Sequence, residues 1–214
     1  MCNRYANRGS VAQIRALAAL MDYDLATTSA TDNYGGQENI YPNQDVPILR
    51  ASGEGRLELA MMRWGFPPIT NIRNLQSRWW RDVNREWMTE PKYRALVPFT
   101  AFAEPVRDST WFTVKDVEIP CFAGVWRPWC GERLAEQPGK KRRVREERDW
   151  ELYAFLTTEA NDLVRPVHDK AMPVILTDPD EMKEWLSGGK ASLRLQRPYP
   201  TERMAIVLQT LVDL

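Results

Sequence analysis

Apolar residues alternate with polar ones, or stand in short runs, along most of the chain, a pattern typical of β-strands. We predict strands at 46–51, 56–64, 94–102, 111–114, 120–126, 150–157, 173–176 and 204–208. The turn 52–55 contains two glycines and is expected to join the first two strands as a hairpin. The strands at 111–114 and 120–126 predict a second hairpin or a meander.

Helical spacing of apolar residues occurs in fewer places. Residues 11–21 (VAQIRALAALM) predict a short helix with Ser10 as its cap. Asp178 followed by proline predicts a second helix, which should end at the glycine pair 188–189. Because strands outnumber helices and no strand–helix–strand repeat is present, the pattern favours an α+β fold. We expect a single domain over 1–214, built on a mostly antiparallel, barrel-like β-sheet with flanking helices.

Three polar or charged segments have no strand pattern. Residues 22–43 are expected to form a loop, and 132–148, which are dense in charge, an exposed excursion between strands. A charged run of this kind is usually solvated, but it could also bind nucleic acid. Residues 75–92 should be helical and carry three tryptophans among arginines. They fit either a core helix with a solvated arginine face or a surface that stacks bases and meets phosphates.

Composition narrows the function classes. The 214 residues include 29 Lys plus Arg and 29 Asp plus Glu. Zero net charge argues against a protein coated in positive charge, although it leaves room for a local basic groove. Three cysteines without a CxxC motif and a single histidine argue against zinc, so we expect no metal and no cofactor. Free thiols and the lack of a signal peptide or apolar span predict a cytoplasmic protein without membrane contact.

Cys2 directly follows the first methionine. Cysteine is small enough for Met1 to be removed, so we expect Cys2 to become the mature N-terminus. Its α-amine (pKa about 7.7–8.0) and its thiol (about 8.5) would then both be partly reactive at neutral pH. Such a pair captures aldehydes, because the amine forms an imine and the thiol closes a thiazolidine ring on it. The alternative is that Cys2 is only the second residue of an ordinary start.

A set of short motifs runs through the chain from end to end. They are MCNRY at 1–5, NIYPNQDVPIL at 39–49, RWGFPP at 63–68, NIR at 71–73, RALVPFTAFAE at 94–104, CFAGVW at 121–126, FLTTEAND at 155–162, VHDKAMPVIL at 167–176 and RPYP at 197–200. In this order the chain resembles the SOS-response-associated peptidase (SRAP) family of abasic-site processing proteins. It departs from the usual family pattern at Asn3 and Tyr5, and it lacks the usual acidic residue after Arg73.

The resemblance implies a covalent sensor of abasic sites in single-stranded DNA. Cys2 would form a thiazolidine with the ring-opened sugar. The resemblance also implies abasic-site lyase activity and self-processing peptidase activity. His168 would assist ring opening, Glu104 would act as general acid and base, and Asn71 would orient the sugar. DNA contacts are expected from Arg4, Pro42, Trp64, Arg73, Arg78, Thr157 and Thr158; the alternative for Trp64 is core packing, and for the threonines a place in the strand edge.

Two other functions remain open. Cys2, His168 and Glu104 also have the residue types of a thiol peptidase, which would cleave a protein substrate. The arginine and tryptophan segment could instead serve a non-catalytic single-strand binder, with equal affinity for intact and abasic strands. We expect a monomer whose partner is single-stranded DNA containing abasic sites, in a setting of DNA damage and repair.

Overall fold

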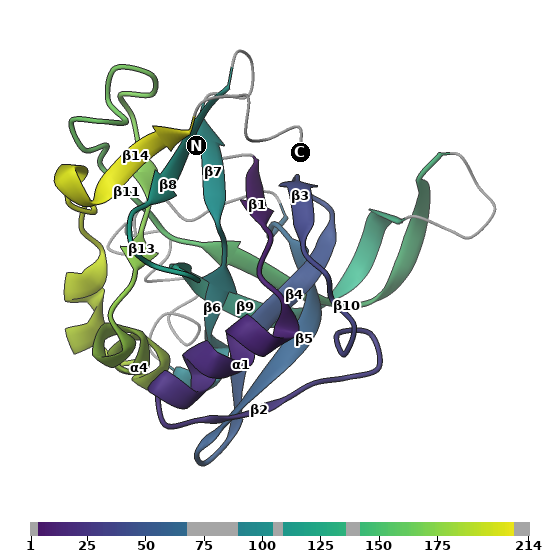
Figure 1. The fold of residues 1–214 in the computed structure, drawn as a ribbon. Helices are drawn as coiled ribbons and strands as arrows, with labels where there is room; N and C mark the ends of the chain where they lie inside the picture. The colour runs from purple at the N-terminus through teal and green to yellow at the C-terminus, as the bar shows by residue number, and fades with distance from the viewer. Residues whose placement is uncertain (1–3, 68–89, 105–108, 136–141, 208–214) are drawn as a thin grey trace.

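The computed structural model describes residues 4–67, 90–104, 109–135 and 142–207. It confirms the predicted α+β class, because strands hold far more of these residues than helices do and part of them form a closed barrel (Figure 1). The barrel strands, in spatial order, are β10 (Val144–Phe155), β5 (Arg56–Trp64), β4 (Asp45–Gly53), β6 (Arg94–Pro98) and β9 (Cys121–Ala135). Antiparallel pairing of β9 with β10 and parallel pairing of β10 with β5 close the ring.

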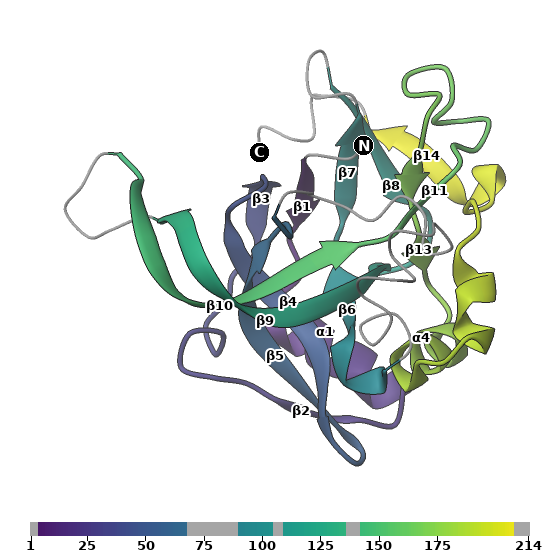
Figure 2. The same cartoon turned by 180° about the vertical axis from the view of Figure 1, so that it is seen from behind.

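A second, antiparallel sheet packs against the barrel. Its order is β14 (Met204–Val207), β8 (Thr110–Val114), β7 (Ala101–Glu104), β1 (Tyr5–Asn7) and β3 (Gln37–Ile40). The barrel sheet is extended by β2 (Asp24–Ala26) and β13 (Ile175–Leu176), and β11 (Thr157–Thr158) pairs with β12 (Met172–Pro173). The strands β7, β1 and β3 lie side by side in both views (Figures 1 and 2), which places the start of the described chain next to the end of β7.

Both helices with clear sequence caps form as predicted. Helix α1 (Val11–Leu20) begins at Ser10, whose side chain accepts from the Gln13 amide while the Gln13 side chain accepts from the Ser10 amide. Helix α4 (Pro179–Ser187) begins at Asp178 and ends at Gly188, whose φ of 72° is in the region that favours glycine. Single 3₁₀ turns are formed by Pro91–Tyr93, Ala191–Leu195 and Thr201–Arg203.

Alternate residues of the barrel strands supply two different hydrophobic cores. On β5, Leu57 and Leu59 join the core that includes residues of α1 and α4. The even-numbered Met62 and Trp64 join the other core, which includes residues of the second sheet. This two-residue alternation is the reason that the strand pattern was visible in the sequence.

Three predictions about strand connections are wrong. The predicted strand 94–102 is two strands in different sheets, because the amide of Phe99 donates to Pro120 and that of Thr100 donates to Ala6. Both halves are apolar, so the hydrophobic pattern runs through the break. The predicted hairpin or meander of 111–114 with 120–126 does not form, since β8 pairs with β7 and β14 instead. The predicted loop 22–43 contains β2 and β3.

The charged segment 132–148 was expected to be an excursion, yet much of it is strand. The ends of β9 and β10 continue past the barrel as a two-stranded ribbon, which we call the β9–β10 arm (residues 129–135 and 142–150). Figures 1 and 2 show this arm projecting away from the barrel. The predicted helix 75–92 lies outside the described residues except for 90–92. Among the described helices, neither is long and apolar enough to cross a membrane.

Candidate active site at the end of β7

Glu104 is the last residue of β7 and is almost completely buried, at 1% exposure. Its Oε2 lies 3.4 Å from His168 Nδ1, whereas its Oε1 has no hydrogen-bond partner among the described residues. Burial raises the pKa of the Glu104 carboxyl from its ordinary value of 4.5 to about 7, because the charged form is deprived of water. A carboxyl with such a pKa can give or take a proton near neutral pH.

His168 lies on the loop 159–171, which the short pair of strands β11 and β12 closes. Its backbone amide donates to Val164 O, and its Nδ1 lies 2.9 Å from Ala171 O. Since a carbonyl oxygen only accepts, we assign the ring proton to Nδ1, which leaves Nε2 as the nitrogen that exchanges protons. The loop therefore fixes the orientation of the imidazole beside Glu104.

The first described residues run next to this pair. The amide of Ala103 donates to Arg4 O at 3.0 Å, and Tyr5 pairs with Phe102. Cys2 is two residues before Arg4, a separation that the chain spans in at most about 7 Å. Of the four predicted reactive residues, the structure brings Glu104 and His168 together; Cys2 and Asn71 lie outside the described residues.

Arg4 is half-buried, and its guanidinium is held by neighbouring side chains. It donates through Nε to Asn39 Oδ1 at 2.8 Å and lies over the Trp111 and Tyr41 rings, 4.8 and 5.6 Å from their centroids. Arg4, a predicted DNA contact, therefore lies at the start of β1, between β7, which carries Glu104, and β3.

Pro42 and Trp64 have different environments. Pro42 is half-buried on the turn between β3 and β4, where it lines a pocket of about 300 Å³. Trp64 has no exposed surface, and its ring packs 5.2 Å from the centroids of Tyr5 and Phe155. This burial favours core packing for Trp64 over the predicted stacking on bases, because no face of the indole is open to a base.

The remaining predicted DNA contacts are only partly described. Thr157 is buried, and its carbonyl accepts from Gln196 Nε2 at 2.9 Å. Thr158, the next residue of β11, is half-buried and is therefore the more accessible of the two hydroxyls. Arg73 and Arg78 lie outside the described residues.

The sequence reasoning missed Asn161, which connects the His168 loop to the rest of the fold. It is 7% exposed, its Oδ1 accepts from Val164 N at 3.0 Å, and its Nδ2 donates to Tyr199 O at 2.7 Å. Val164 O in turn accepts from His168 N. The FLTTEAND stretch was a signal for this residue, but a side chain that binds only backbone atoms carries no chemical signature.

Replacing Asn161 by alanine is expected to destabilise the protein by about 1–3 kcal/mol, because two buried backbone groups lose their partner. It should also loosen the His168 ring. Because the chain has a single histidine, its ring resonances in an NMR spectrum report this without ambiguity. Asn161→Asp, which keeps the acceptor for Val164, should restore part of the order; unchanged histidine signals in Asn161→Ala would show that Asn161 does not position His168.

Comparison with solved structures shows the same fold in three bacterial proteins at 20% sequence identity. A protein from Bacteroides thetaiotaomicron matches with a TM-score of 0.69, covering 100% of this chain and 95% of that one. A protein from Bordetella bronchiseptica matches with a TM-score of 0.64, covering 97% and 100%. A phage-related protein from the same organism matches with a TM-score of 0.62, covering 97% and 95%.

A comparison with curated proteins gave no match. The sequence does match the model of the family described as SOS response associated peptidase (SRAP), over residues 1–210. This match includes the strand that carries Glu104 and the loop that carries His168, and it covers nearly the whole chain. The chain therefore belongs to the SOS response associated peptidase (SRAP) family.

Proposed function

We propose that this protein recognises abasic sites in single-stranded DNA and binds them covalently through Cys2 as its mature N-terminus. The observation that carries the proposal is the buried Glu104 carboxyl, with a pKa near 7, at 3.4 Å from His168 and beside the first described strand. A carboxyl paired with an imidazole next to an amino-terminal cysteine suits the proton transfers that imine chemistry requires.

The reaction consumes one aldehyde and releases one water. His168 assists opening of the sugar, which exposes the aldehyde at C1. The amine of Cys2 adds to this carbon, and protonated Glu104 donates a proton to the hydroxyl group as it leaves as water. The thiolate then attacks the imine carbon, so that a C–S bond forms and the nitrogen takes up a proton. The product is a five-membered thiazolidine between protein and DNA.

The same imine explains the lyase activity that we include in the proposal. If a base removes a proton from the sugar C2 before the thiol adds, the electrons expel the 3′ phosphate and the strand is cleaved. Ring closure by the thiol removes the imine and so suppresses this elimination. A free terminal thiol therefore decides between capture and cleavage.

Intact mass spectrometry after incubation with an abasic single strand tests the proposal. We expect a species with the mass of the chain without Met1 plus the strand minus one water. A strand without an abasic site is the matched control and should give no adduct. If the abasic strand gives only free protein and free DNA, the proposed covalent binding is wrong.

A thiol peptidase is the second candidate, and the contact between Glu104 and His168 is the observation that favours it. A carboxylate that orients an imidazole is the usual support of a thiol nucleophile. This candidate requires cleavage of a separate protein substrate, whereas aldehyde capture does not. Incubation with an unfolded protein substrate, read by gel, separates the two.

A further inference from the structure

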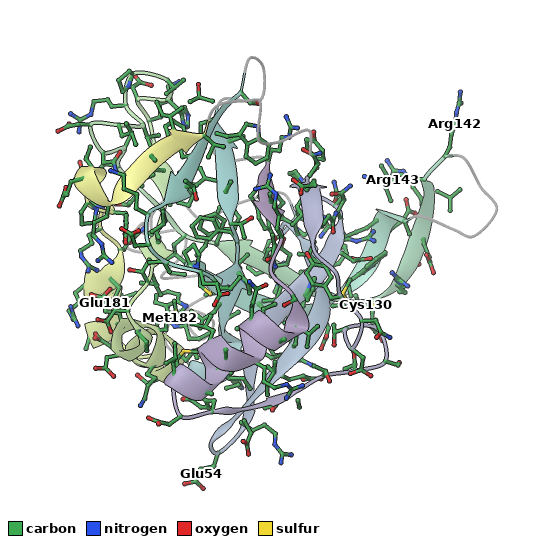
Figure 3. The ribbon with its side chains drawn as sticks, in the orientation of Figure 1. Glu54, Cys130, Arg142, Arg143, Glu181 and Met182 are labelled. Carbon is green, nitrogen blue, oxygen red and sulfur yellow. The ribbon has the colours of Figure 1, made fainter. Side chains whose placement is uncertain are left out.

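The β9–β10 arm carries positive charge that the proposed chemistry does not use. The stretch 132–148 has seven Lys or Arg residues against four Glu, and the arm residues as defined have five Arg against three Glu and one Asp. Arg142 and Arg143 lie at the far end of the described part of the arm, away from the barrel (Figure 3). A projecting ribbon with an excess of arginine attracts phosphates through its local potential.

The root of this arm forms one wall of the pocket that Pro42 lines. The pocket of about 300 Å³ lies between the turn after β3, the segment after β5 and the arm residues 132–134 and 145. It offers apolar surface as well as charge, because Pro67 is exposed and Leu134 is 45% exposed. A base can pack on such an apolar surface while the neighbouring phosphate meets the arginines.

Arg133 is fixed in this pocket by neutral oxygens. Its guanidinium donates to Gly65 O at 2.5 Å and to Asn43 Oδ1, and no carboxylate of the described residues lies within ion-pair distance of it. Burial and the nearby Arg63 lower its pKa to about 10, so Arg133 still carries its charge at neutral pH. The positive charge is thus oriented, and the carboxylate whose charge acts on it, Asp45, forms its ion pair with Arg63.

A chain of contacts links this pocket to the candidate active site. Arg4 binds the backbone of Ala103, next to Glu104, and its guanidinium lies over the Tyr41 ring. Tyr41 begins the turn whose Asn43 accepts from Arg133. Because adjacent strands are about 4.8 Å apart, β3 lies about 10 Å from β7, with β1 between them. A single strand that crosses the ends of β7, β1 and β3 would pass from Glu104 to the turn that contacts the arm.

We propose that the β9–β10 arm and the pocket at its root form a second binding site for the same DNA single strand, away from the lesion. A phosphate lies against Arg133 and Arg145, and a base packs on Pro67 and Leu134. This inference rests on the proposed function, since it assigns a place to the strand that flanks the abasic site. The site binds the DNA on only one side of the lesion, either 5′ or 3′, because the arm lies on one side of β7.

Crosslinking rates with abasic strands of different flank length test the inference. The full-length protein is incubated with single strands that have about 4 nucleotides on each side of the lesion, or about 16 on the 5′ or the 3′ side. We expect extension of one side alone to raise the rate of adduct formation about fivefold, because added phosphate contacts increase affinity. The same extension made double-stranded should give no such gain.

Arg145→Glu is the diagnostic variant, because Arg145 is 77% exposed and forms an ion pair with Glu132 at the surface. It should reduce the gain to less than about twofold and lower the salt dependence of the rate, since a phosphate contact is lost. Arg194→Glu is the matched control: Arg194 is 62% exposed, pairs with Glu184, and lies in a 3₁₀ turn outside the arm. Arg133 is not used, because its bonds hold the turn 41–44.

The outcomes separate the two proposals. The arm site is wrong if the rate of adduct formation does not depend on flank length. It is also wrong if Arg145→Glu keeps the rate gain from the longer flank as fully as Arg194→Glu does. Neither result contradicts the proposed function. A gain that needs a double-stranded flank also overturns the arm site. No adduct with any strand overturns the proposed function, and this inference with it.

Discussion

Cys2→Ala is expected to abolish covalent capture of an abasic strand completely, while the protein keeps its non-covalent affinity for single strands. Alanine leaves the terminal amine but removes the thiol, so the imine cannot close to a thiazolidine. The transient imine should instead give more strand cleavage than in the unchanged protein. A denaturing gel with an abasic oligonucleotide measures adduct and cleaved strand in the same lane.

The other cysteines provide matched controls for Cys2. Cys121 is buried, and burial raises the pKa of its thiol. Cys130 is exposed, and a hydrogen bond with Asp149 raises the pKa of its thiol, so it is a poor nucleophile near neutral pH. Cys130→Ala should therefore leave the adduct unchanged. Protein that retains Met1 should form none, although its Cys2 thiol is present. An adduct that survives Cys2→Ala contradicts the proposed chemistry.

Glu104→Gln is expected to slow adduct formation on the order of 100-fold at pH 7, because glutamine cannot transfer the protons that the imine steps need. In the unchanged protein the rate should fall above about pH 7, where Glu104 loses its proton. In Glu104→Gln it should rise steadily with pH, as the terminal amine loses its proton near about 7.7–8.0. Rates from pH 5 to 9 measure both profiles.

Glu104→Gln should also change how the free energy of unfolding depends on pH. Because the folded pKa of about 7 exceeds the ordinary 4.5, the folded state binds more protons than the unfolded state between these values. The free energy of unfolding should therefore fall as pH rises from 4.5 to 7, by up to on the order of 3 kcal/mol, and stay level above. Glu104→Gln should remove this fall.

Urea unfolding at pH 5 and pH 8 measures this difference. The control is Glu159→Gln, an exposed glutamate on the loop that carries His168, which should keep the pH dependence of the unchanged protein. If Glu104→Gln and Glu159→Gln show the same change between the two pH values, Glu104 does not titrate near pH 7.

Local sequence signals predicted a helix or strand correctly where a single signal, such as a cap residue or a two-residue alternation, defined the element. Ser10 and Asp178 marked their helix starts, because a side-chain cap depends only on residues within one turn. Strand 56–64 was predicted with its observed bounds, since its alternation reports two different buried faces. The apolar run 94–102 was misread because a strand that changes sheets looks the same in sequence as one that does not.

In the candidate site, too, the sequence predicted some features and only the fold shows the others. The motifs named Glu104 and His168, but only the fold shows that the glutamate is buried and that the imidazole is held through Ala171 and Val164. Asn161 escaped notice because its partners are backbone atoms 38 residues away at Tyr199 and on its own loop. The charged segment 132–148 was visible, but its ribbon form depends on pairing between β9 and β10.

The order of residues alone thus indicated the family resemblance, the α+β class and the candidate reactive residues, because motifs, alternation and caps are local properties of the chain. The raised pKa of Glu104, its contact with His168, the burial of Trp64 and the position of the arm beside Pro42 arose only on folding. Each of these features arises because segments that are distant in sequence come into contact and exclude water from one another. A local sequence pattern contains no information about such a contact.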